Sequence, residues 1–247
     1  MIIIIIFICH WYLSLFCQSF FLHRYGAHRM FTMSKFWERF FFMMTYITQG
    51  ASFLNPRSYA VMHRMHHAYS DKLKDPHSPH NSKGLLRMMW RTRLFYERVL
   101  KYQMKPKPVF TKNFPEWKSL ENFMEGWFSR IMWGIGMIVL YIFFAHPVWI
   151  WFLLPVQLII GPVQGAIVNW SGHKYGYQSF DNQDKSKNSL PLDILMMGEL
   201  FQNNHHKFPM RSNFAVKWFE FDPIYPVIKV LTWFHIIRFP KKQFAKA

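Results

Sequence analysis

The chain opens with the run MIIIIIFICHWYLSLFCQSFFL, whose 22 residues include no Asp, Glu, Lys or Arg. About 20 apolar residues are enough for a helix to cross the roughly 30 Å hydrocarbon layer of a bilayer. A secretory signal is the alternative, but the run has no basic start and no small-residue cleavage site. We therefore predict a retained transmembrane helix over about 1–22, in a chain of which 51% is apolar and 20% aromatic.

A second apolar block runs from Trp127 to Trp170 and is interrupted near Ala145–Pro147. It is long enough for two crossings, over about 127–145 and 147–170. Most of the net charge of +17 lies in 57–118 and 174–247. Positive loops tend to remain in the cytoplasm, so both stretches are predicted to be cytoplasmic. No basic stretch belongs to a recognisable nucleic-acid-binding module, which excludes a nucleic-acid partner.

Histidines are unusually frequent, with 13 in the chain, and eight of them fall into four groups. The groups are HRYGAH (His23, His28), HRMHH (His63, His66, His67), NWSGH (Asn169, His173) and QNNHH (Gln202, His205, His206). In the second group the spacing i, i+3, i+4 places all three rings on one face of a helix. Imidazole suits iron, zinc and copper, and eight imidazoles are too many for one four-coordinate ion. The groups therefore predict a site for two metals.

The other histidines lack partners at ligand spacing, and we interpret them as interfacial or hydrogen-bonding residues: His10, His77, His80, His146 and His235. Cys9 and Cys17 both lie inside the first apolar run without paired spacing. They indicate buried thiols rather than a disulfide or a thiolate metal site.

The segment 33–56 separates the first two histidine groups. If it crossed the membrane, those groups would face opposite sides and could not share a site. Its polar ends and amphipathic middle favour a helix that lies in the interface. We therefore predict one all-α integral membrane domain over 1–247, with three crossings and a cytoplasmic helical cap that holds the di-metal site. A fourth crossing is the open alternative.

The four histidine groups, in this order, resemble those of the membrane fatty acyl desaturases, in particular the acyl-CoA delta-9 type found in bacteria and animals. The likeness covers residues 10–210. It implies a di-iron centre that uses O2 and faces the cytoplasm. The implied ligands are His23, His28, His63, His66, His67, His173, His205 and His206, with Asn169 acting through a water molecule.

Two positions depart from the family pattern. The third family box begins with His, whereas this chain has Gln202, a weaker neutral ligand that either binds iron or orients its neighbours. The animal acyl-CoA enzymes carry an Arg-Asp pair just before the second box, where this chain has Val61 and Met62. The acyl carrier is therefore left open between coenzyme A, acyl carrier protein and a lipid.

Other residues near the boxes are candidates for supporting roles. Carboxylates should hold the ring tautomers of ligating histidines, and those nearest in sequence are Asp71, Asp75, Asp181 and Glu199. Candidates for an apolar acyl tunnel are Met65, Trp170 and Tyr177. Candidates for contact with a phosphate-bearing headgroup or anionic lipid are Arg24, Arg64, Lys74, Arg87, Arg91 and Lys174. For most of these six residues, a solvated basic face on the cytoplasmic side is the favoured interpretation.

The resemblance implies an oxygen-dependent desaturase that introduces a cis double bond, at delta-9 by analogy, into a saturated acyl chain. The sequence after 210 is too short for a cytochrome-like domain, so electrons are expected from a separate ferredoxin or cytochrome b5-like protein. The implied location is a bacterial inner membrane. Two alternatives remain: a membrane di-iron hydroxylase that inserts oxygen, and a non-enzymatic metal-binding membrane protein, which would need polar residues along a path across the bilayer.

Overall fold

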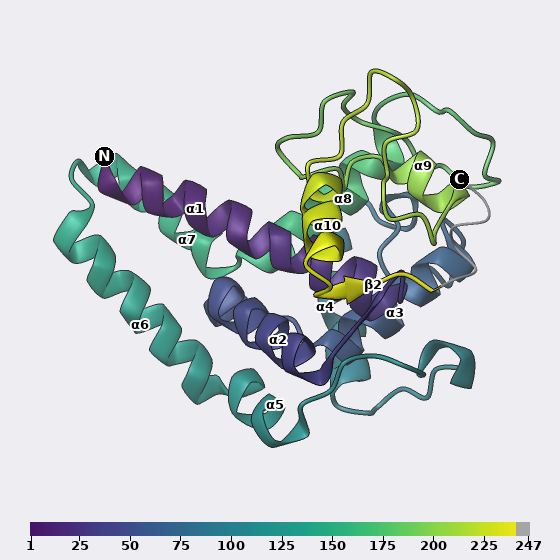
Figure 1. Ribbon diagram of the computed structural model, residues 1–247. Helices are drawn as coiled ribbons and strands as arrows, with labels where there is room; N and C mark the ends of the chain where they lie inside the picture. The colour runs from purple at the N-terminus through teal and green to yellow at the C-terminus, as the bar shows by residue number, and fades with distance from the viewer. Residues whose placement is uncertain (241–247) are drawn as a thin grey trace.

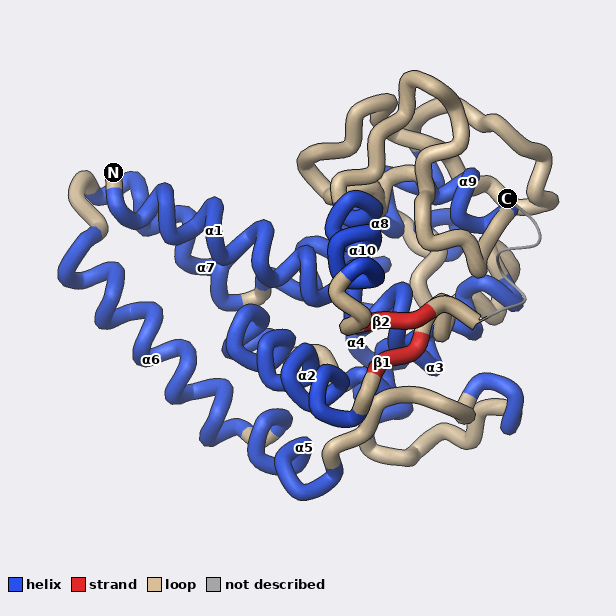
Figure 2. The backbone as a smooth tube through the Cα atoms, in the orientation of Figure 1, coloured by secondary structure: helices blue, strands red, loops and turns tan. Residues whose placement is uncertain are grey.

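The computed structural model describes residues 1–240, so the end of the predicted cytoplasmic segment, 241–247, lies outside the described residues. Helices dominate the described part, and the prediction of an all-α fold is confirmed. The short strands β1 (Thr32–Met33) and β2 (Ile237–Arg238) pair antiparallel and join two segments distant in sequence. Figure 2 shows this pair between the helical part and the loop-rich part.

The first helix, α1 (Ile2–Phe16), continues without a break into a π-helix, η1 (Cys17–Ala27). Together they form an apolar run of 26 residues that is long enough to span a membrane. The helix therefore ends at Ala27 rather than near 22, because His23 and Arg24 are themselves helical. This places His23 on the helix and His28 at its C-terminal cap.

Two further segments meet the same criterion of length and composition. Helix α6 (Trp127–Phe144) does so by itself. The second is a pair bent by 77°, in which a 3₁₀ turn, η5 (Val148–Phe152), and α7 (Leu153–Leu158) precede α8 (Ile160–Lys174). The break lies at Ile159 because Pro162 has no N–H to donate to the carbonyl of Leu158. Within residues 1–240, two helices are thus long and apolar enough to cross a membrane, and the number of such spans is three if the bent pair counts as one.

The segment predicted to lie in the interface forms α2 (Lys35–Gln49) and a 3₁₀ turn, η2 (Gly50–Ser52). The Ser34 side chain caps the start of α2 by accepting from the Trp37 amide. The helix buries Phe41 and Phe42 and exposes Phe36 and Phe40. Its buried face joins the largest apolar cluster of the chain, which also contains side chains from η1 and α10 (Ile224–Trp233).

The remaining elements form a cap at one end of the long helices (Figure 1). They are α3 (Pro56–Tyr69), η3 (Pro79–Asn81), α4 (Leu85–Leu100), η4 (Pro108–Phe110), α5 (Lys118–Glu125) and α9 (Gln202–Lys207). Residues 175–201 and 208–223 are largely irregular. Helix α3 packs against η1, while α9 packs against α8. The cap therefore gathers four elements that each carry histidines.

Candidate metal centre

The π-helix η1 decides how the first two histidines lie. The His28 amide donates to the His23 carbonyl at 3.1 Å, which is the i to i−5 bond of a π turn. In an α-helix, residues five apart point to different sides, because each residue turns the chain by about 100°. The wider π turn instead brings the two rings together, with centroids 5.0 Å apart.

Helix α3 carries the second group and is held against η1 by Arg64. The helix begins with the Asn55 side chain accepting from the Ser58 amide, followed by Pro56 in the first turn. The Arg64 guanidinium donates to the carbonyls of Ala27 at 2.7 Å and Gly26 at 3.0 Å. These bonds tie the two segments together, so the guanidinium of Arg64, one of the six headgroup candidates, is engaged within the fold.

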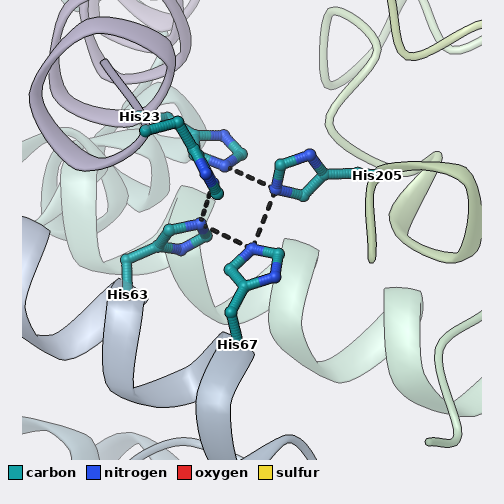
Figure 3. Close-up of side chains that lie close together, drawn as sticks. His23, His63, His67 and His205 are labelled. Carbon is teal, nitrogen blue, oxygen red and sulfur yellow. Dashed lines mark hydrogen bonds between the residues drawn. The ribbon is translucent and has the colours of Figure 1, made fainter. Parts of the chain in front are cut away.

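Five histidines from η1, α3 and α9 form one group, in which one ring nitrogen of each lies within 4.8 Å of the others. Its members are His23, His28, His63, His67 and His205. The His67 Nε2 atom lies 3.0 Å from the Nε2 atoms of both His63 and His205. Figure 3 shows the rings of His23, His63, His67 and His205 turned toward a common centre.

The other three histidines of the boxes form a second group: His66 on α3, His173 on α8 and His206 on α9. Their Nε2 atoms are buried and have no hydrogen-bond partner in the described chain. Each Nδ1 atom bonds a carboxylate, from Asp75 for His66, Asp71 for His173 and Asp184 for His206. A ring that donates from Nδ1 presents the lone pair of Nε2, so all three rings offer a metal-binding atom.

Burial controls the charge of the first group. It lowers the pKa of four imidazoles well below the usual value, and the neighbouring histidines add to the effect: His28, His63, His67 and His205. In the second group, burial likewise lowers the pKa of His206 to about 4, although Asp184 acts in the opposite direction. A neutral imidazole is the form that binds a metal, so these rings are ready to bind at neutral pH.

The carboxylates behind the second group remain ionised. Burial alone would raise the pKa of Asp71 and Asp75, but the bonds and charges of His173 and His66 outweigh it and hold both values well below normal. Asp184 is affected in the same way by His206. The negative charges thus lie on the far side of each ring from the three free Nε2 atoms.

Glu199 supports the first group through a buried ion network. Its carboxylate bonds His23 Nδ1 at 2.6 Å and accepts from the Arg24 guanidinium at 2.8 Å. Arg24 also donates to Asp222 at 2.8 Å and is fully buried. Burial would raise the pKa of Glu199, but His23 and Arg24 outweigh it and lower the value to about 2. Arg24 therefore neutralises carboxylates inside the cap, and its burial rules it out both as a headgroup contact and as part of a solvated basic face.

Sequence reasoning missed Asp184 and chose Asp181 instead. Asp181 accepts a bond from the Gln183 amide at 3.3 Å, whereas Asp184 bonds His206 at 2.7 Å. Both residues lie in an irregular loop, where no periodicity indicates which side chain points inward. The sequence indicated only that one of these two carboxylates would lie close to a group of histidines.

The two uncharged candidates, Gln202 and Asn169, each donate a hydrogen bond to a backbone carbonyl. The Gln202 amide nitrogen donates to the Glu199 backbone carbonyl at 2.7 Å, and the side chain packs against Gly172. The Asn169 amide nitrogen donates to the Gly165 carbonyl at 2.7 Å, one turn before His173. Metal binding by either residue stays a prediction.

His77 is the second residue that sequence reasoning missed. It is buried, its ring centroid lies 4.4 Å from that of His66, and neither ring nitrogen has a hydrogen-bond partner in the described chain. Burial lowers the pKa of His77 to about 3. By contrast, His10 and His80 bond backbone carbonyls, of Thr48 and His173.

A cavity of about 340 Å³ lies beside α3, and one of the three predicted tunnel residues, Met65, lines it. Its lining mixes aromatic and basic side chains, including Tyr69, Phe95, Lys74 and Arg91. Tyr177 bonds Glu220 at 2.6 Å, and Trp170 lies under the Lys174 ammonium. The guanidinium of Arg91 is engaged by the backbone carbonyls of Asn81, Leu73 and Asp75.

Both groups fit metal ions. A metal–imidazole bond of roughly 2.1 Å places two ligand nitrogens at right angles about 3 Å apart. The Nε2 atoms of the first group have this spacing, with distances of 3.0 Å from His23 to His205 and 2.7 Å from His28 to His63. In the second group, the three buried Nε2 atoms without partners are donors that a cation would satisfy. Donor sets made of nitrogen without thiolate suit iron or zinc.

A family model described as fatty acid desaturase matches residues 1–233, which is nearly the whole chain. The chain belongs to the fatty acid desaturase family.

The relatives differ in what they act on. The acyl-CoA 5-desaturase AL21 of Anemone leveillei is 29% identical over 85% of this chain and 63% of its own length. The sn-1 stearoyl-lipid 9-desaturase of Anabaena variabilis is 29% identical over 85% of this chain and 72% of its own. The hex-5-enoyl-[acyl-carrier protein] acetylenase of Moorena producens is 28% identical over 88% and 70%. The matches with some relatives therefore cover less than two thirds of the relative's length.

Proposed function

We propose that this protein is an oxygen-dependent acyl desaturase that introduces a cis double bond into a saturated acyl chain. The observation that carries the proposal is the convergence of eight histidines into two groups of ring nitrogens, four of them backed by carboxylates. Family membership supports the reaction type. Relatives named for acyl-CoA, lipid and acyl-carrier-protein substrates support a fatty acyl chain as substrate, with delta-9 as the proposed position.

In this proposal two iron ions occupy the two groups. His23, His28, His63, His67 and His205 would hold one ion, while His66, His173 and His206 would hold the other. Asn169 would contribute through a water molecule. Bound iron would supply the activation of O2 that removal of hydrogen from an unactivated methylene requires and that no side chain provides.

The protein's own groups have two tasks. The carboxylates of Glu199, Asp75 and Asp71 hold the Nδ1 proton of their histidines, which fixes each ring in the orientation that presents Nε2. Burial of the rings in the cap excludes bulk water from the centre. The overall reaction also consumes two electrons and two protons for each O2, which leaves as two molecules of water.

Three of the eight histidines lie at the ends of the long apolar helices: His23 on η1, His28 at its cap and His173 at the end of α8. The excess of basic residues in the segments that form the cap supports a cytoplasmic location for this end, in a bacterial inner membrane. A separate electron donor with an acidic surface, such as a ferredoxin or cytochrome b5-like protein, would complement the basic cap.

The test combines product analysis with metal analysis. Expression in a host that lacks the corresponding desaturase should add unsaturated chains to the host lipids, and the purified protein should contain two irons per chain. His66→Ala and His206→Ala should each abolish the double bond and part of the iron, because each removes a nitrogen ligand. His235→Asn is the matched control, since His235 is exposed, lies outside both groups and has a positive φ that Asn tolerates.

Two outcomes would contradict the proposal. Unchanged iron in both alanine variants would rule against the assigned site. A product that gains one oxygen instead of losing two hydrogens would replace the desaturase with the hydroxylase.

A further inference from the structure

Ten large apolar side chains are exposed on the cap, away from both histidine groups. They come from three segments of the C-terminal part: Leu190, Leu192, Ile194 and Leu195; Trp218, Phe219 and Phe221; Val230, Trp233 and Phe234. Trp218 is 94% exposed and Trp233 is 76% exposed. We call these ten residues the apolar lip. Large exposed apolar surface marks an interaction site where it is contiguous.

Two of the three segments are joined directly. Leu192 and Phe221 pair through a parallel backbone bridge, so the loop 190–195 and the loop 218–221 form one surface. This loop surface also adjoins the first spanning helix. The Trp11 indole on α1 donates to the Leu195 carbonyl at 3.2 Å. The apolar lip therefore adjoins α1, which belongs to a helix long and apolar enough to span a bilayer.

The third segment, α10, is amphipathic. Its inner face buries Ile224 and Ile228 in the cluster that includes Phe20 of η1 and Phe41 of α2. Val230 and Trp233 lie on the exposed side. Figure 1 shows α10 lying across the chain near the end of the α1–η1 rod, rather than parallel to it. A helix crossing a membrane-spanning rod at its end, with an apolar outer face, has the arrangement of an interfacial helix.

We propose that the apolar lip inserts into the bilayer interface. It thereby holds the cap against the membrane on the side of α1 where α10 lies. Lipid is the occupant because the lip continues from the flank of a spanning helix, where acyl chains and headgroups already surround α1. Its two most exposed residues are tryptophans, the side chain enriched at membrane interfaces, and Lys229 on α10 is long enough to reach the headgroups. This contact is independent of the reaction at the metals.

The experiment measures the depth of single spin labels in proteoliposomes. Cys9 is exposed and would be replaced by Ala, while the buried Cys17 would remain. Trp218→Cys and Trp233→Cys then receive a nitroxide each. Val109→Cys is the matched control, because Val109 is an exposed apolar residue of η4 and lies outside the three segments of the apolar lip. Native-like iron content verifies that each labelled protein is folded.

The labels at 218 and 233 should collide preferentially with oxygen dissolved in the lipid phase, at a depth of about 5–10 Å. The label at 109 should collide preferentially with a water-soluble nickel chelate. Labels at 218 and 233 as accessible to the chelate as the label at 109 would overturn the proposal. Dipolar broadening between labels, lost on dilution with unlabelled protein, would overturn it in favour of a contact between two copies of the chain.

Discussion

At the scale of single residues, Gln202 is the position where the chain differs most from the family pattern. The sequence predicts that Gln202 either binds iron or orients its neighbours. In the structure its amide donates to the Glu199 backbone, and the Glu199 carboxylate bonds His23. Gln202 thus bonds the backbone of the residue whose carboxylate lies behind the first group.

We predict that Gln202→Ala lowers iron affinity by roughly 10-fold to 100-fold, the range for groups that orient ligands. The loss arises because Glu199 is no longer held in place. Gln178→Ala is the control, since the Gln178 amide bonds the backbone of Ser186 and not a residue behind a histidine. Iron titration against a competing chelator measures the affinity. Wild-type affinity and wild-type desaturation in Gln202→Ala would show that the position serves only packing.

The pair Asp181 and Asp184 gives a second residue-scale prediction. Asp184→Asn keeps an acceptor for His206 Nδ1 but removes the charge that makes the ring a strong ligand. We expect one of the two irons to bind about 10-fold to 100-fold more weakly. Asp181→Asn should leave both irons in place, because Asp181 bonds a backbone amide of its own loop. Equal iron loss in the two variants would contradict the structure.

At the scale of elements, the contact between α8 and α9 sets how His173 meets His206. A Cβ atom at Gly172 would lie 2.3 Å from Gln202 Cγ, which is far closer than side chains tolerate. At Gly165, on the same helix, the nearest atom would be Gln18 Nε2 at 3.7 Å, an ordinary contact. Both glycines lie inside α8, but an added side chain would clash with Gln202 at Gly172 and would fit at Gly165.

We predict that Gly172→Ala separates α8 from α9 and lowers iron content, whereas Gly165→Ala does not. Both substitutions gain up to about 1 kcal/mol of helix propensity, so the contrast isolates the contact. Combining Gly172→Ala with Gln202→Ala should restore part of the iron lost in Gly172→Ala, because the double variant removes the clashing atom. Equal iron content in the two single variants would show that α9 shifts without disturbing the centre.

At the scale of the whole molecule, the centre joins η1, α3, α8 and α9, which are distant in sequence. Metal bound only to the folded state stabilises it, by about 2.7 kcal/mol for one site at 100 times its Kd. We predict that removal of iron by a chelator lowers Tm, and that zinc restores Tm without restoring desaturation. Light scattering and tryptophan fluorescence during heating measure the transition. A Tm unaffected by the chelator, with iron verified as removed, would show that the cap holds its shape unaided.

The sequence by itself determined the fold class, the family and the histidine boxes, because long uncharged runs and helical spacing are local properties. It also identified Asp71, Asp75 and Glu199 as carboxylates near the boxes, and each bonds a box histidine in the structure. Only the tertiary structure decided how the rings divide. His63 and His67 join the first group while His66 joins the second, because the ring of His63 lies 4.3 Å from that of His23 on η1, whereas the ring of His66 lies 4.8 Å from that of His173 on α8. The roles of Asp184 and Arg24 and the burial of His77 beside His66 likewise depend on irregular loops and long-range packing, which leave no periodic signal in the chain.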